Sequence, residues 1–266
     1  MKLIVSNLCW NINENNLIIN LLNRFKINNI EISPYKIFNN NYSLGNINKT
    51  QNFWKKNKVN FYSMQSILFN IKNAYLFGNK FEQKVFFNEI KKKIILCKKI
   101  GIKVIVFGSP HSKKIFSNKN LENLNLIAFK SFKKIAKICE KYKIYFCVEA
   151  NPKIYNCEYL NYTNDVIILI KKINSNFFKL NLDLGTIIEN KECFSSIIEN
   201  YIKLIGHVQI SVPHLKDIMS YKSVVCKFIR QLKKENYKRC VSIERLPVDN
   251  NVISLKKTLK LTKKFF

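Results

Sequence analysis

The sequence predicts a single α/β domain, residues 1–266, folded as one closed (β/α)8 barrel of parallel strands. Short apolar, β-branched runs alternate with longer runs at helical spacing, which is typical of repeated βα units. The 266 residues, 47% of them hydrophobic, suit one large core, and no Gly/Pro-rich linker divides the chain. An open doubly wound sheet is the structural alternative, but it does not need eight units.

Eight strands are expected at 3–6, 29–33, 59–65, 103–107, 144–149, 178–183, 207–211 and 240–244. Helices are expected between them near 14–25, 81–100, 121–142, 162–174, 192–203, 215–234 and 252–265. The second unit is weak, because residues 34–57 are rich in Asn and show no clear helix. The segment SNLCWN after the first strand contains no glycine, which counts against a dinucleotide-binding fold.

The net charge of +29 invites a nucleic-acid interpretation. However, only Arg24, Arg230, Arg239 and Arg245 are arginines, and the lysines are spread along the whole chain. Lys, Asn and Ile share A/T-rich codons, so a mutational bias explains all three excesses, and we do not expect a nucleic-acid partner. A field of one sign could still help to capture anionic substrates.

The sequence predicts a cytoplasmic protein. No run of 18 apolar residues occurs, so no membrane span is expected, and the first 16 residues lack the apolar region and cleavage site of a secretory signal. The eight cysteines are scattered singly, without a CxxC pair, which favours free buried thiols in a reducing compartment.

Four polar residues at the ends of the last four strands form the candidate site: Glu149, Asp183, Gln209 and Glu244. Their separations of 34, 26 and 35 residues each fit one βα unit. Because side chains alternate along a strand, inward parity is enough for all four to converge at the barrel mouth. Three carboxylates at one mouth need compensation, and a divalent cation such as Mg²⁺ or Mn²⁺ suits these oxygen ligands.

The motifs resemble the sugar phosphate isomerase/epimerase superfamily, which is built on a xylose isomerase-like TIM barrel. The resemblance covers nearly the whole chain, and the order of the motifs is specific: SNLCW, IEISPYKI, SMQSILF, VFGSPHSK, VEANPKIYNCEYL, LDLGT, HVQIS and VSIE. In many relatives a histidine stands where this chain has Gln209, whereas hydroxypyruvate isomerase-like members also show glutamine in an HxQI sequence. Other branches carry a histidine shortly after the aspartate, which LDLGTII lacks, so a particular epimerase's substrate is not transferred.

The resemblance implies a metal held by Glu149, Asp183, Gln209 and Glu244, and proton transfer beside a carbonyl through a cis-enediolate. Glu149 and Glu244 are the expected acid/base pair, while Asp183 and Gln209 only bind metal. A metal would stabilise the developing negative charge, and paired carboxylates would move the proton.

Five further residues are candidates for substrate binding, and four of them have an alternative role. His207 orients substrate or is a core histidine, and Glu31 binds a hydroxyl or neutralises a lysine. Gln65 is placed near the substrate. Lys113 binds a phosphate or carboxylate, or is simply solvated, and Trp10 forms a wall against a sugar ring or packs in the core.

The expected function is therefore a divalent metal-dependent isomerase or epimerase of a small sugar, sugar phosphate or hydroxy-carbonyl compound. A sugar-derivative dehydratase or lyase on the same barrel is the main alternative, because it begins with the same proton abstraction. An apurinic-site endonuclease would need a histidine-rich zinc cluster, and the chain has only three histidines. A non-catalytic sugar-binding protein also stays open, as does a homo-oligomeric state.

Overall fold

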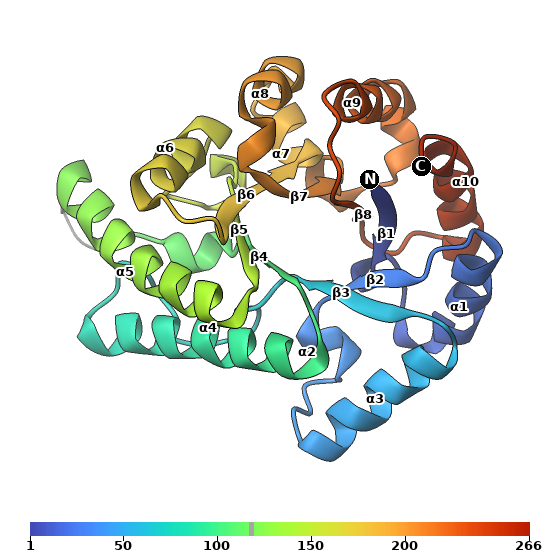
Figure 1. Cartoon of the computed structure of the whole chain (residues 1–266), viewed down its shortest axis with the longest axis horizontal. Coiled ribbons are helices and arrows are strands. Elements are labelled where there is room, and N and C mark those ends of the chain that lie inside the picture. Colours follow the sequence, from blue (N-terminus) through green and yellow to red (C-terminus); the bar gives the residue numbers. More distant parts are fainter. Residues whose placement is uncertain (117–119) are drawn as a thin grey trace.

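The computed structural model, which describes residues 1–116 and 120–266, contains eight parallel strands that close into a ring surrounded by helices (Figure 1). The strands follow the chain order around the barrel: β1 (Lys2–Ser6), β2 (Asn29–Ile32), β3 (Asn60–Met64), β4 (Val104–Phe107), β5 (Tyr145–Glu149), β6 (Phe178–Asp183), β7 (Ile205–Ile210) and β8 (Cys240–Ile243). The predicted (β/α)8 barrel is confirmed, and each predicted strand lies within two residues of its observed bounds.

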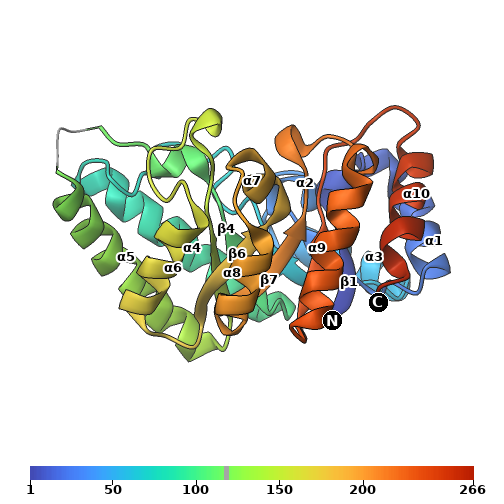
Figure 2. The same cartoon turned by 90° about the horizontal axis from the view of Figure 1, so that it is seen from above.

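The helices of the described chain lie outside the ring: α1 (Asn15–Arg24), α2 (Pro34–Ile37), α3 (Leu44–Lys56), α4 (Lys80–Ile100), α5 (Leu121–Tyr142), α6 (Thr163–Ile173), α7 (Leu184–Glu189), α8 (Phe194–Tyr201), α9 (Lys222–Lys234) and α10 (Asn251–Lys263). Two short helices, α2 and α7, lie at the end of the barrel opposite the chain termini (Figure 2). None of the helices in the described parts of the chain is long and apolar enough to cross a membrane.

Helix α3 is the longest of three α-helices in the described chain that the sequence pattern did not reveal, the other two being the short helices α2 and α7. Ser43 caps its first turn by accepting a hydrogen bond from the backbone N–H of Asn46 at 3.4 Å. Its apolar face is narrow, with only Ile47 and Trp54 buried. Trp54 packs against Trp10, with ring centroids 6.0 Å apart. Tertiary packing by one large side chain therefore compensates for an otherwise polar helix.

The main core lies between the strands and the helices. On one side of the barrel, Phe107, Phe146 and Phe178 from neighbouring strands pack around Phe132 of α5, with ring centroids 5.6–6.5 Å from it. All eight cysteines are free thiols, and six of them are buried, as the scattered spacing predicted. This apolar shell holds the strands in a register that brings their C-terminal ends to one mouth.

Candidate active site at the barrel mouth

Three of the four predicted ligands line one cavity of about 340 Å³. Glu149 ends β5, Asp183 ends β6, and Glu244 directly follows β8. Because all strands are parallel, these positions lie at the same end of the barrel. Glu149, Asp183 and Glu244 therefore line the same mouth of the barrel, and their role as a metal site stays a prediction.

Burial raises the pKa of each carboxyl group, and the charges of nearby carboxylates add to the shift. Burial, followed by the charge of Asp183, raises the pKa of Glu149 to about 8. Burial together with Glu149 and Asp183 raises the pKa of Glu244 well above its ordinary value. Burial also raises the pKa of Asp183, although hydrogen bonds from Ser211 and Thr186 oppose the shift. Without added positive charge, the cavity therefore favours the protonated form of its own carboxyl groups.

Asp183 is fixed by two hydrogen bonds to its carboxylate. The hydroxyl of Ser211 donates to Oδ2 at 2.5 Å, and the backbone N–H of Thr186 donates to Oδ1 at 2.7 Å, so Asp183 also caps α7. The Ser211 hydroxyl lies so close to Gly185 that a Cβ there would stand 2.4 Å from its oxygen. Glycine is thus required for Ser211 to approach both Gly185 and Asp183.

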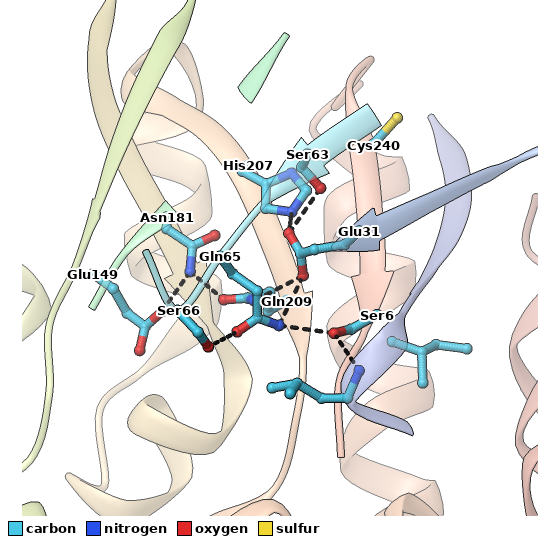
Figure 3. A network of polar contacts seen from close by, with 12 residues as sticks. Ser6, Glu31, Ser63, Gln65, Ser66, Glu149, Asn181, His207, Gln209 and Cys240 are labelled. Atoms are coloured by element: carbon cyan, nitrogen blue, oxygen red, sulfur yellow. Dashed lines mark hydrogen bonds and ion pairs between the residues drawn. The ribbon is translucent and has the colours of Figure 1, made fainter. Parts of the chain in front are cut away.

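Gln209 is fully buried on β7, and its orientation is set by Glu31 (Figure 3). The Gln209 Nε2 group donates to Glu31 Oε1 at 2.9 Å. Since a carboxylate only accepts, the nitrogen of the Gln209 amide must face Glu31 and its oxygen must face away. That oxygen lies toward Asn181 and hence toward Glu149.

Asn181, on β6, connects Gln209 to Glu149. Its Nδ2 group donates to Gln209 Oε1 at 2.5 Å and to Glu149 Oε2 at 2.9 Å. A second amide, Asn151, donates to the other Glu149 oxygen at 2.7 Å. The Oδ1 atom of Asn181 is buried and has no hydrogen-bond partner among the described residues. The two hydrogen bonds from Nδ2 therefore hold Asn181 in one orientation, although its side-chain oxygen accepts no hydrogen bond from these residues.

Glu31 and His207 form the centre of the buried network beneath the cavity. The His207 Nε2 atom lies 2.8 Å from Glu31 Oε2, and the Ser63 hydroxyl donates to the same oxygen at 2.8 Å. Burial alone would raise the pKa of Glu31, but His207, Ser63 and Gln209 outweigh it and hold the pKa below its ordinary value. Glu31, His207 and Gln209 are completely buried and do not line the cavity, and hydrogen bonds connect Glu31 to Glu149 through Gln209 and Asn181.

The other predicted substrate contacts are also buried and bound to protein groups. Gln65 donates to Ser6 at 2.8 Å and to Glu31 at 3.3 Å. The Lys113 ammonium is bound by Asn151 Oδ1 at 2.7 Å and by the Glu149 carbonyl oxygen at 3.2 Å, and burial lowers its pKa. Trp10 is 1% exposed and donates to Asn15 at 2.8 Å. In this structure these three side chains stabilise the loops and core around the cavity.

Three residues of the cavity wall were not predicted from the sequence: Asn151, Tyr155 and Ser211. His214, which the sequence suggests is a loop residue rather than a ligand, also lines the wall. The Tyr155 hydroxyl accepts a hydrogen bond from the backbone N–H of His214 at 3.0 Å, and their rings meet edge to face. Asn181 was not predicted either, although its spacing from Asp183 gives it the same inward parity. Asn151 and Ser211 each lie two residues beyond a predicted ligand, which is the signal that could have found them.

The carboxylate and amide oxygens at this site are of the type that a hard divalent cation binds. Three carboxylates face one cavity, and the Gln209 oxygen keeps a second lone pair while it accepts from Asn181. Within residues 1–116 and 120–266, however, no three His, Cys, Asp or Glu side chains are arranged so that they could hold a metal ion as they stand. Glu149 and Asp183 accept hydrogen bonds from amide, hydroxyl and backbone N–H groups, so a bound cation would compete with these donors for the carboxylate oxygens.

The fold and this mouth define a (β/α)8 barrel with an acidic polar site at the C-terminal ends of β5 to β8. A family model described as "Xylose isomerase-like TIM barrel" matches residues 20–263. The chain therefore belongs to the xylose isomerase-like TIM barrel family, as the motif order predicted. No functionally curated protein matches the chain.

Solved structures similar to this chain include sugar epimerases. One is 3-keto-D-glucoside 4-epimerase YcjR from E. coli, with 14% identity, a TM-score of 0.77, and coverage of 98% of this chain and 99% of that chain. D-psicose 3-epimerase from Clostridium cellulolyticum H10, with D-tagatose, has 15% identity, a TM-score of 0.74, and coverage of 100% and 96%. The IOLI protein, solved with a zinc atom, has 16% identity, a TM-score of 0.71, and coverage of 100% and 99%. At these identities the likeness shows the fold alone.

Proposed function

We propose that the protein is a divalent metal-dependent isomerase or epimerase of a small sugar, sugar phosphate or hydroxy-carbonyl compound. The observation that most supports this function is the meeting of Glu149 and Glu244 at one cavity, from β5 and β8. Two carboxylates beside one bound carbon skeleton are what a proton removal and a proton return require. The epimerases among the structural neighbours are consistent with this chemistry.

Mn²⁺ or Mg²⁺ is the cation that the oxygen donors favour, and Glu149, Asp183, Gln209 and Glu244 would hold it. When bound, such an ion would polarise the substrate carbonyl and the adjacent hydroxyl. Hydrogen bonds from Ser211 and Thr186 would hold the Asp183 carboxylate in position to bind the ion. Hydrogen bonds with Glu31 and Asn181 would hold the Gln209 amide in the same way. These supports keep the donors in place while the two glutamates change protonation state.

The proposed reaction is a proton transfer beside a carbonyl group. One glutamate removes the proton from the carbon beside the carbonyl, and the electron pair of the broken C–H bond forms a C=C bond. The carbonyl π electrons move to oxygen, which gives an enediolate. The other glutamate then returns a proton. In an epimerisation this proton goes to the opposite face of the same carbon. In an isomerisation it goes to the former carbonyl carbon, while the proton of the adjacent hydroxyl moves to the former carbonyl oxygen, so that the hydroxyl carbon becomes the new carbonyl.

The nuclease alternative gains no support from the placement of the histidines. His111, on the loop after β4, contacts Tyr75, and His207 is buried against Glu31. Of the three histidines, only His214 lines the cavity. A dehydratase would share the first proton transfer and would then lose a hydroxyl group from the neighbouring carbon. The product separates these two reactions.

The test is solvent exchange. Purified protein is incubated in D₂O with Mn²⁺ and a panel of ketoses, aldoses and hydroxy-aldehydes, and deuterium at the carbon beside the carbonyl is followed by NMR. Exchange with retention of the carbon skeleton and all hydroxyls supports the isomerase or epimerase. Loss of a hydroxyl indicates a dehydratase, and the absence of exchange across the panel would remove the proposal.

A further inference from the structure

A second and larger cavity, of about 760 Å³, lies between the loop after β3 and the loop after β4. Residues 66–75 form one wall, and residues 109–112 form the other. Both loops follow the C-terminal ends of strands, so this second cavity opens at the same end of the barrel as the site with Glu149. Its size is well within the range of small-molecule pockets.

One short loop separates the two cavities. A Cβ atom on Gly108 would stand 3.0 Å from Glu149 Oε1 and 3.3 Å from Asn151 Nδ2, so the backbone at this position touches the site. The next residue, Ser109, already lines the second cavity. On the other wall the Ser66 hydroxyl donates to Gln65 Oε1 at 3.1 Å, within the network of Figure 3. The two cavities are therefore neighbours rather than separate surfaces.

The wall of the second cavity combines an aromatic face with polar groups. Phe69 is 50% exposed, and Tyr35 supports it from one side with ring centroids 4.2 Å apart and planes 28° from parallel. The Tyr75 hydroxyl lies 3.0 Å from His111 Nε2. A sugar ring presents C–H groups on its faces and hydroxyls around its edge, which suits an aromatic platform beside hydrogen-bonding side chains.

Four residues of these walls have their backbone in the left-handed region. Ser66, Asn70, Asn73 and Ser109 all line the cavity, and their φ angles are 52°, 61°, 56° and 43°. Asn adopts this region readily, whereas the two serines do so at a conformational cost. The hydrogen bond from the Leu76 backbone N–H to the Ser112 carbonyl, 2.9 Å, ties the two walls together.

We propose that this second cavity is a subsite for a further sugar ring, so that the preferred substrate is a disaccharide or other glycoside. The inference rests on the proposed function, because the reacting ring would occupy the smaller cavity beside Glu149 and Glu244. The second sugar ring would extend past the loop at residues 108–109 into the second cavity and lie against Phe69. A wall with both aromatic and polar groups fits a hydroxylated ring better than a purely apolar group.

Saturation-transfer NMR tests the subsite through binding alone. The protein is mixed, in buffer that contains Mn²⁺, with one of four sugars: glucose, methyl glucoside, maltose or cellobiose. Saturation transfer from the protein is then measured on the protons of each sugar ring. Wild-type protein is expected to saturate both rings of at least one disaccharide and to bind it more tightly than the matching monosaccharide. Phe69→Ala should weaken disaccharide binding about 2- to 10-fold and leave monosaccharide binding unchanged.

Phe81→Ala is the matched control, because Phe81 is an exposed phenylalanine (63%) that does not line the cavity. This variant should bind like the wild type. Glu244→Gln separates the two proposals: second-ring saturation that persists without solvent exchange supports the subsite whatever happens to catalysis. Equal affinity for mono- and disaccharides, or a Phe69→Ala protein that binds disaccharides normally, would overturn the subsite even if solvent exchange is observed.

Discussion

The side-chain nitrogen of Asn181 donates hydrogen bonds to both Gln209, at 2.5 Å, and Glu149, at 2.9 Å. This single amide therefore links a proposed metal ligand to a proposed acid/base group. Its direction is not free, because Glu31 fixes the Gln209 amide with its oxygen toward Asn181. The buried Glu31 thus sets the orientation of the Gln209 amide, and Gln209 in turn sets the orientation of the Asn181 amide beside Glu149.

Replacing Asn181 by Leu should weaken Mn²⁺ binding about 10- to 100-fold, because supporting groups of this kind typically have that effect on affinity. The substitution keeps the branched shape of the side chain but removes the donor to both Gln209 and Glu149. Calorimetric titration with Mn²⁺ provides the measurement. Asn190→Leu is the control, since the Asn190 amide binds Asn161 and Glu192 instead. Unchanged Mn²⁺ affinity in Asn181→Leu would show that Gln209 needs no such support.

Replacing Glu244 by Gln should leave metal binding largely intact and reduce solvent exchange by about 10²–10⁴-fold. The amide keeps an oxygen and nearly the same volume, but it cannot take up a proton at neutral pH. Deuterium uptake and Mn²⁺ titration are measured on the same preparation. Exchange at the wild-type rate would remove Glu244 from the proton transfer.

Asp183→Ala should weaken Mn²⁺ binding more than Asn181→Leu does, because it deletes an oxygen ligand outright. It also removes the cap of α7, so thermal unfolding without metal should be compared in parallel. Thr186→Ala is not a suitable control, since the Thr186 hydroxyl donates to the Ala150 carbonyl nearby. Strong Mn²⁺ binding by the Asp183→Ala protein would contradict the ligand assignment.

The metal-free protein should become less stable as the pH rises from about 5 to about 8. Glu149 has a folded-state pKa of about 8 against an ordinary value of 4.5, so in this interval the folded state binds more protons than the unfolded state. One such group contributes up to about 1.4 kcal/mol per pH unit, and the upward shifts of Asp183 and Glu244 act in the same direction. Denaturant unfolding at several pH values measures the slope.

Added Mn²⁺ should flatten or reverse that slope, because the cation favours the ionised carboxylates. Glu149→Gln should also reduce the slope without metal. A metal-free protein whose stability increases steadily across this interval would show that the three carboxyl groups are not buried together as described.

Trp54→Ala should destabilise the fold by about 3–5 kcal/mol, the usual effect of truncating a buried aromatic side chain. Trp54 is 1% exposed and provides most of the buried face of α3. The adjacent Phe53→Ala is the control, because Phe53 is 38% exposed. Equal losses in the two variants, measured by urea unfolding, would mean that α3 does not depend on its contact with Trp10.

The barrel could be predicted from the sequence because each strand is a short and largely buried run, and helical patterns separate most of the strands. Helix α3 escaped prediction because only Ile47 and Trp54 face inward, too few to produce a clear period among the Asn residues. The pattern also placed Glu149, Asp183 and Glu244 at one mouth, which follows from parallel strands alone.

Side-chain partners were harder to predict than positions. Lys113 looked like a solvent-accessible lysine, yet the loops after β4 and β5 enclose it completely. Trp10 was open to two roles, and its contact with Trp54 across 44 residues places it in the core. Such outcomes depend on which loops fold over one another, and a single sequence has no local signal for that.

The ring of strands closes only when β8 docks between β7 and β1. Glu244 follows that strand directly, so the docking of β8 is what brings Glu244 to the same mouth as Glu149 and Asp183. A partly folded chain with β8 undocked carries two of the three carboxylates and exposes the edges of β1 and β7. A divalent cation bound by all three carboxylates would then stabilise the closed ring. It would oppose the release of β8 from β7 and β1 and slow unfolding that begins there.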